Sequence, residues 1–143
     1  MICADTSFLL SYYGEDVFSE RARAHRATAT QAIHIHSFNE FELANALRLH
    51  VFRKKIAAEQ MDEWLASFEA DKSAGILVLA AVDANAVLRR AEILSAAQTK
   101  TGGNRSYDIL HIAAAKILGA TEFWSFDGKQ RALAAAEGLT VGP

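Results

Sequence analysis

A chain of 143 residues that is 51% apolar is long enough to bury the core of one domain, so we expect a single domain over residues 1–143. The 15 Lys and Arg against 17 Asp and Glu give a net charge of -2, which argues against strongly basic nucleic-acid binders and acidic disordered tails. The lone cysteine, Cys3, excludes an internal disulfide and a thiolate metal cluster, and it favours a reducing cytoplasm. No apolar run is long enough to cross a membrane.

In chain order, five short runs rich in apolar, β-branched or aromatic residues predict β-strands. These strands are expected at residues 1–4, 33–36, 76–82, 122–126 and 139–141. The segments between them have the apolar period of helices, with Asp83 as a cap and Gly119 and Gly138 as stop signals. Helices are expected at residues 7–13, 15–29, 38–51, 56–68, 84–99, 106–118 and 129–137.

Strands that alternate with helices, several of them apolar at nearly every position, indicate a parallel sheet covered on both faces. The predicted fold is therefore an α/β three-layer α/β/α sandwich with a mostly parallel sheet of about five strands. In such sheets, ligands bind at the carboxyl ends of the strands, where the strand order reverses. We therefore expect the chemistry at that edge.

Four acidic residues are expected at this edge of the sheet. Asp5 and Asp127 each follow a strand, Asp108 lies in the first turn of a helix, and Glu42 lies on the helix after the second strand. Taken singly, each has an ordinary explanation: a helix cap for Asp5 and Asp127, a favourable helix-dipole contact for Asp108, and a surface position for Glu42. Glu40 lies two positions from Glu42 and therefore on a different face of the helix.

Together, the four acids indicate a cation site. Clustered carboxylates repel one another unless a hard divalent cation neutralises them, and ligation by oxygen alone suits Mg²⁺ or Mn²⁺. Such a cation can orient and deprotonate a water and stabilise charge that develops on a phosphoryl oxygen. Metal-assisted phosphodiester hydrolysis is consistent with this pattern but does not follow from it uniquely.

Four sequence motifs resemble the PIN-domain family, and within it the VapC-type toxins of toxin-antitoxin pairs. The motifs are ADTSFLL at 4–10, ELANALR at 42–48, YDILHIAAA at 107–115 and SFD at 125–127. The resemblance implies a PIN-like fold and an Mg²⁺- or Mn²⁺-dependent endoribonuclease that leaves 3′-hydroxyl and 5′-phosphate ends. It also implies RNA as the substrate, a cognate antitoxin as a partner, and a homodimer.

Carried over by position, the resemblance implies that Asp5, Glu42, Asp108 and Asp127 are the catalytic and metal-binding residues. Glu42 is chosen over Glu40 because the sequence that follows it matches the motif better. On this interpretation, neighbouring hydroxyls orient the carboxylates through hydrogen bonds, a role that serine and threonine fill well. The hydroxyl residues expected to do so are Thr6, Ser7 and Ser125.

Two other functions stay open. One is a non-cleaving PIN-like module that binds RNA or protein. The other is a phosphatase or phosphotransfer domain with Asp5 as nucleophile, although the residue at position 7 is serine where a haloacid-dehalogenase pattern has aspartate.

Several further side chains are expected to be structural or accessory. His34 and His36 share one side of a strand, but no third metal ligand is evident. His111 is interpreted as a packed helix histidine, with a supporting or acid role beside Asp108 as the alternative. Arg105 is interpreted as the basic residue best placed to contact a phosphate. Three large aromatic residues are expected in the core or at a subunit contact. They are Trp64, Phe68 and Trp124.

Overall fold

The computed structural model describes all residues from 1 to 143. Its strands are β1 (Ile2–Ala4), β2 (Ile33–Ile35), β3 (Leu77–Leu79), β4 (Glu122–Trp124) and β5 (Thr140–Gly142). Its helices are α1 (Thr6–Tyr13), α2 (Ser19–Thr28), α3 (Ser37–Phe52), α4 (Ala58–Ser73), α5 (Ala84–Gly102), α6 (Ser106–Leu118) and α7 (Gly128–Ala136). None of the helices is both long enough and apolar enough to span a membrane.

The five strands form one sheet in the order β3-β2-β1-β4-β5, and every neighbouring pair is parallel. In the register of the central pair, Ala4 lies opposite Trp124. The chain moves outward from β1 through β2 to β3 and then returns to the other side of β1 for β4. The strand order therefore reverses between β1 and β4, and the residues that follow these two strands lie at the switch point where ligands bind in sheets of this type.

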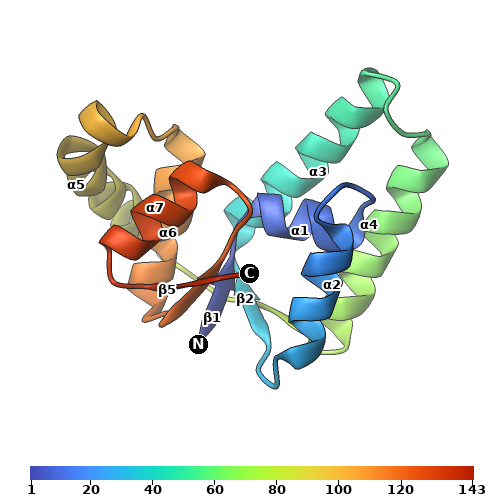
Figure 1. Cartoon of the computed structure of the whole chain (residues 1–143), viewed down its shortest axis with the longest axis horizontal. Helices are drawn as coiled ribbons and strands as arrows, with labels where there is room; N and C mark the ends of the chain where they lie inside the picture. The colour runs from blue at the N-terminus through green and yellow to red at the C-terminus, as the bar shows by residue number, and fades with distance from the viewer.

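Helices cover both faces of the sheet, as the sequence predicts (Figure 1). One buried apolar cluster joins the sheet to α1, α2, α3 and α4 through residues such as Phe8 and Leu43. The other joins it to α5, α6 and α7 through residues such as Val87 and Ile112. The predicted three-layer α/β/α sandwich is thus confirmed, and the packing on both faces holds the carboxyl edge of the sheet in place.

The main differences from the predicted boundaries are local. Residues 80–82 lie outside β3 because β3 is an edge strand and β2, its neighbour, ends at Ile35. Phe126 leaves β4 because its N–H bonds to the Ser7 hydroxyl and not to a strand. Helix α2 begins at Ser19 because the carboxylate of Asp16 holds the preceding residues in a turn.

The predicted end of α6 is confirmed at Gly119. This residue has φ of 74°, in the left-handed region that side chains other than glycine rarely adopt. Its N–H bonds back to the last turn of α6. The chain then turns into β4, and Asp127 follows three residues after the end of this strand.

Candidate active site

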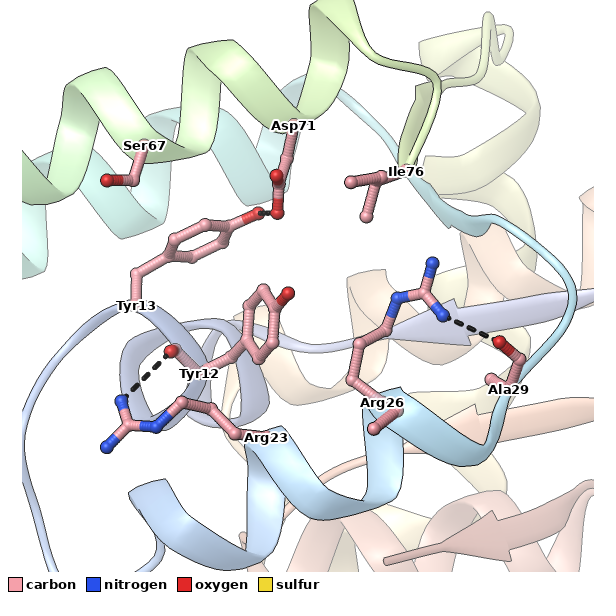
Figure 2. Close-up of a pocket in the computed structure, with 9 residues that line it drawn as sticks. Tyr12, Tyr13, Arg23, Arg26, Ala29, Ser67, Asp71 and Ile76 are labelled. Atoms are coloured by element: carbon pink, nitrogen blue, oxygen red, sulfur yellow. Dashed lines mark hydrogen bonds between the residues drawn. The ribbon is translucent and has the colours of Figure 1, made fainter.

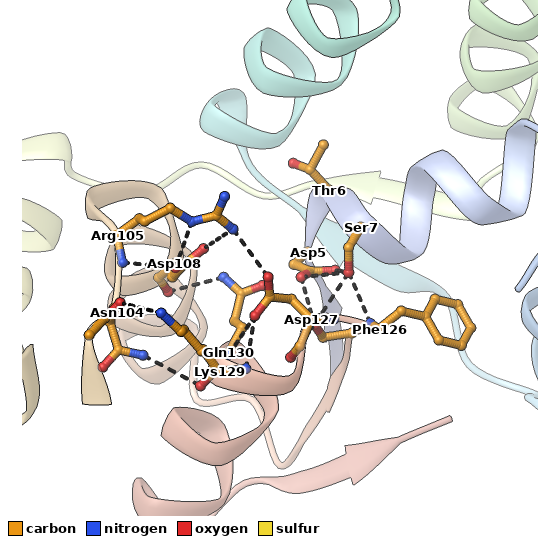
Figure 3. Close-up of polar contacts among 12 residues, drawn as sticks. Asp5, Thr6, Ser7, Asn104, Arg105, Asp108, Phe126, Asp127, Lys129 and Gln130 are labelled. Carbon is orange, nitrogen blue, oxygen red and sulfur yellow. Dashed lines mark hydrogen bonds and ion pairs between the residues drawn. The ribbon is translucent and has the colours of Figure 1, made fainter. Parts of the chain in front are cut away.

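The four acids line one small pocket of about 60 Å³ at the carboxyl edge of the sheet. Figure 3 shows three of them, Asp5, Asp108 and Asp127. The four acids come from four different places in the fold: the ends of β1 and β4, helix α3 and the start of α6. No apolar residue lines the pocket. Its walls are Asp5, Thr6, Ser7, Glu42, Arg105, Asp108, His111, Asp127 and Gln130. We call this the acidic pocket.

Asp5 serves both of the roles that its sequence position suggests. One carboxylate oxygen caps α1, because Oδ1 accepts the N–H of Phe8 at 2.8 Å. The other, Oδ2, accepts the hydroxyl of Ser125 at 2.7 Å, and Ser7 donates to both oxygens at 2.8 and 2.9 Å. Burial raises the pKa of the Asp5 carboxyl, and the hydrogen bonds offset this only in part. The predicted hydroxyl partners Ser7 and Ser125 thus contact the carboxylate as expected.

Asp127 divides its oxygens in the same way. Its Oδ1 caps α7 by accepting the N–H groups of Lys129 at 2.9 Å and Gln130 at 3.0 Å. Its Oδ2 faces the acidic pocket and accepts Nη2 of Arg105 at 3.1 Å. The helix-cap and site interpretations are therefore compatible, since one carboxylate has oxygens enough for both.

Asp108 is 6% exposed and binds the start of its own helix, because Oδ2 accepts the backbone N–H of Arg105 at 2.8 Å. The guanidinium of Arg105 lies on the same carboxylate, with Nε 3.3 Å from Oδ2 and Nη2 3.4 Å from Oδ1. Because Nη2 also reaches Asp127, one guanidinium joins two of the four acids (Figure 3). The sequence predicted a phosphate contact for Arg105, whereas here its charge offsets the site's own carboxylates.

Glu42, like Asp127, is half-buried. Its Oε2 accepts His111 Nε2 at 2.7 Å and the hydroxyl of Thr6. Burial raises the pKa of the Glu42 carboxyl, but the hydrogen bonds from His111 and Thr6 and the charge of Arg105 outweigh it, so the pKa is lowered. Glu40 points elsewhere and pairs with Lys72 on α4 at 2.5 Å. Of the two glutamates, Glu42 is therefore the one in the acidic pocket.

His111 was not predicted as part of the site, although its position three residues after Asp108 placed it on the same helical face. Asn39 defines the tautomer of its ring. The Oδ1 of Asn39 accepts the backbone N–H of His36 at 3.1 Å, so the other amide atom of Asn39 is the donor Nδ2. This Nδ2 donates to the Ala4 carbonyl and, at 3.3 Å, to Nδ1 of His111. Nδ1 therefore accepts, and Nε2 carries the proton that is donated to Glu42.

Gln130 is a second residue that the sequence did not indicate. It is 1% exposed, lines the acidic pocket, and donates from Nε2 to the Asp108 carbonyl at 3.1 Å. Nothing in the sequence around Gln130 indicated this role, because its contact with Asp108 joins α7 to α6 and the strand β4 lies between them in the chain. It fastens the start of α7 to the start of α6.

The donor chemistry of the acidic pocket fits a hard divalent cation, since its carboxylates offer oxygen ligands alone. In the arrangement described here, however, no three His, Cys, Asp or Glu side chains are grouped so that they could hold one metal ion. Arg105 already offsets Asp108 and Asp127. A cation shared by these acids therefore requires the exposed Arg105 side chain to move away.

The remaining predicted residues contribute to packing. Phe68 and Trp124 are buried in the core, as expected, whereas Trp64 is only partly buried. His36 is buried against His111, with ring centroids 5.2 Å apart, and burial lowers its pKa to about 3.

A larger cavity of about 530 Å³ lies at the opposite edge of the sheet, beside residues that precede β2 and β3 (Figure 2). Several of its polar groups bond to other groups of the protein. Tyr13 donates to Asp71 at 2.8 Å, and Arg26 donates to the Ala29 carbonyl at 2.9 Å. Because it lies at the amino ends of the strands and holds no acid cluster, it is not the candidate active site.

The model of the PIN-domain family matches residues 2–136. Among solved structures, the chain is similar to the Mycobacterium tuberculosis toxin VapC20, described as cleaving the sarcin-ricin loop, with a TM-score of 0.72 and 16% identity over 98% of this chain and 97% of that one. It is also similar to PAE2754 from Pyrobaculum aerophilum, with a TM-score of 0.56 and 14% identity over 98% of this chain and 87% of that one. The comparison with curated proteins found no match.

Proposed function

The chain belongs to the PIN-domain family, and from this premise we propose that residues 1–143 form a metal-dependent endoribonuclease domain. The observation that carries the proposal is the acidic pocket itself. Four carboxylates that are up to 122 positions apart in the sequence line one cavity without apolar walls, at the switch point of the sheet. Burying like charges together is unfavourable, which supports a bound cation as the group that neutralises them.

Asp5, Glu42, Asp108 and Asp127 would hold the cation, Mg²⁺ or Mn²⁺. When bound, such a cation would lower the pKa of a coordinated water and stabilise the negative charge that develops on a phosphate oxygen. The carboxylates that would surround it are oriented by their neighbours. Ser7 and Ser125 hold Asp5, and His111 and Thr6 hold Glu42, so each of these acids is ordered before any ligand arrives.

We further propose that the protein is the toxin of a toxin-antitoxin pair, acting in the cytoplasm as a homodimer that a cognate antitoxin inhibits. The overall similarity to the VapC20 toxin supports this part of the proposal. The identity of 16% carries only the fold, so the RNA that VapC20 cleaves is not transferred to this chain.

The geometry of Asp5 disfavours the alternative of an aspartate-nucleophile phosphatase. Both of its carboxylate oxygens accept hydrogen bonds, and the residue is 2% exposed. An attacking carboxylate needs a free oxygen aimed at the phosphorus atom. A non-cleaving PIN-like module remains the second candidate, and the experiment below separates it from the nuclease.

The test is RNA cleavage by the purified protein over a series of Mg²⁺ and Mn²⁺ concentrations. We expect cleavage that EDTA stops, that Asp5→Asn and Glu42→Gln abolish, and that Glu40→Gln retains. Glu40 is a matched control because it lies on the same helix and pairs with Lys72 outside the pocket. Cleavage that persists in EDTA or in Asp5→Asn refutes the metal-dependent site, and a folded protein that never cleaves favours the non-cleaving module.

The toxin role has a separate test. Induced expression of the wild-type protein should arrest the growth of a bacterial host, and expression of Asp5→Asn at the same level should not. Equal growth of the two cultures would contradict the toxin role without bearing on the nuclease activity in solution.

A further inference from the structure

A groove of about 480 Å³ opens directly beside the acidic pocket and is not part of it. The two share Ser7 and Asp127 as walls, so a chain whose phosphate reaches the acids can continue into the groove. Its other principal walls are Phe18 at the start of α2, Trp64 on α4, and His50 and Lys55 at the turn between α3 and α4. We call it the Phe18–Trp64 groove.

Two aromatic side chains of the groove, Phe18 and Trp64, are not fully buried. Phe18 stacks one face on Phe126, with centroids 4.7 Å apart and planes inclined by 8°, and it stays 40% exposed. Trp64 is half-buried and packs its ring edge toward the backbone of Gly14, where an added Cβ would lie 3.2 Å from the indole. The groove thus holds two rings fixed by packing, and flat rings of this kind stack on bases that are not paired.

The turn between α3 and α4, at the top of Figure 1, gives the groove a positive rim. Arg53, Lys54 and Lys55 are consecutive and exposed, and none of their side chains has an ion-pair or hydrogen-bond partner. Burial and the charges of Lys55 and Arg53 lower the pKa of His50 in the same wall. Lys54 has φ of 55° and directly follows the C-cap of α3, where the left-handed conformation commonly ends a helix.

Three acids also line the groove. Glu15 pairs with Arg23 and Asp127 pairs with Arg105, both at 3.1 Å. Asp16 accepts the hydroxyl of Ser11 and the backbone N–H of Phe18, both at 2.8 Å, and its charge is not paired with a cation. The three cations of the rim outnumber this one unpaired acid, so the rim can attract an anionic ligand, and phosphates are the anions that accompany stacked bases.

We propose that the Phe18–Trp64 groove is a nucleobase subsite that binds an unpaired base of single-stranded RNA, adjacent to the phosphate held at the acidic pocket. Phe18 and Trp64 stack the base, and Lys55 contacts a neighbouring phosphate. The volume of the groove lies within the range of about 300 to 1,000 Å³ that is usual for small-molecule sites, and so accommodates a base. This inference rests on the proposed ribonuclease function and deepens it, because it names the residues that would hold a base of the RNA next to the acidic pocket.

Binding is tested on the full chain carrying Asp5→Asn, in EDTA, with a hexameric oligoribonucleotide and a hexamer of the same backbone without bases. Trp64 is the reporter, since the only other tryptophan, Trp124, is 1% exposed. We expect the oligoribonucleotide, and not the abasic one, to quench the fluorescence, and Trp64→Phe to lose the signal while binding persists. Equal binding of both hexamers without quenching would show contact with phosphate alone and overturn the subsite.

Variants assign the contacts. Phe18→Leu should weaken binding about tenfold, as expected for the loss of one stacked base, and Phe18→Tyr should restore it. Lys55→Gln should weaken binding and lower the salt dependence by about one phosphate contact. The matched controls are Val17→Ala, beside Phe18, and Arg89→Gln, on the exposed face of α5, and neither should change the affinity. Unchanged affinity in folded Phe18→Leu and Lys55→Gln would also overturn the subsite.

The same variants in the wild-type background separate this inference from the proposed function. If Asp5-dependent cleavage occurs and Phe18→Leu and Lys55→Gln cleave as the wild type does, the ribonuclease stands and the subsite is wrong. If the hexamer quenches Trp64 and responds to the variants but no RNA is cleaved, the subsite stands and the ribonuclease is wrong.

Discussion

His111 on α6 donates from Nε2 to Oε2 of Glu42 on α3 at 2.7 Å, which joins two helices across the candidate site. Removing this donor leaves Glu42 with the Thr6 hydroxyl as its one remaining side-chain donor. We therefore expect His111→Gln to lower kcat/KM for RNA cleavage by about 10- to 100-fold, as is typical when a carboxylate ligand loses its supporting hydrogen bond.

The double variant His111→Gln/Glu42→Gln distinguishes this positioning role from a separate catalytic one. If His111 acts through Glu42, the double variant should lose no more activity than Glu42→Gln alone. His25→Gln, on α2 against Trp124, is the control and should cleave like the wild type. Additive losses in the double variant would contradict the positioning role.

Arg105 and a divalent cation should compete for the same carboxylates. The side chain of Arg105 is 74% exposed, so its contribution is that of a surface ion pair, about 1 kcal/mol at most. Arg105→Gln should accordingly bind Mn²⁺ about fivefold more tightly in calorimetric titrations. Arg89→Gln, which loses only a long exposed contact to Asp83, should bind as the wild type does. Weaker binding by Arg105→Gln would mean that Arg105 orders the acids and does not compete.

His36 should make the fold less stable in mild acid. Burial lowers its pKa to about 3 in the folded protein, whereas the unfolded chain has the ordinary value of 6.5. As the pH falls below 6.5, the unfolded state takes up a proton that the folded state does not, so the free energy of unfolding decreases. The loss from this residue at pH 5 is about 2 kcal/mol.

Denaturant unfolding at pH 7.5 and pH 5 checks this effect. The decrease between the two values should be smaller in His36→Gln than in the wild type, whatever the variant does to stability at pH 7.5. The same decrease in both proteins would place the acid sensitivity in other groups.

Cys3 should be unreactive until the protein unfolds. It lies in the central strand, is 2% exposed, and burial raises the pKa of its thiol to about 12, so it holds no thiolate at neutral pH. We expect no reaction with a disulfide reagent at pH 8 under native conditions and one thiol per chain in guanidinium chloride. Rapid labelling of the native protein would contradict the buried position of β1.

Much of the architecture was predictable because it depends on local chemistry. Apolar periodicity located all five strands and all seven helices, and the residues after β1 and β4 were recognisable because a strand followed by Asp and a helix is a short-range pattern. Several boundaries moved. At residues 15–18, 80–82 and 125–126, side-chain hydrogen bonds or the end of a neighbouring strand determine the backbone, and α4 and α5 extend beyond their predicted ends to Ser73 and Gly102.

The motif in the sequence favoured Glu42 over Glu40, but the contacts of the two side chains depend on distant residues. Glu40 pairs with Lys72 of α4, whereas Glu42 accepts a hydrogen bond from His111, 69 positions away. Two other features depend on how separate parts of the chain meet. One is the ion pair between Arg105 and Asp127, and the other is the wall that the acidic pocket shares with the Phe18–Trp64 groove.

The residue order was therefore sufficient for the layers, the parallel sheet and the four candidate acids, because hydrophobic period and helix capping act over a few residues. The protonated nitrogen of His111, the Arg105 bridge and the groove beside the acids required the packed molecule. Hydrogen bonds and ion pairs depend on distances of about 3 Å between atoms, and for residues far apart in the chain those distances exist only after folding.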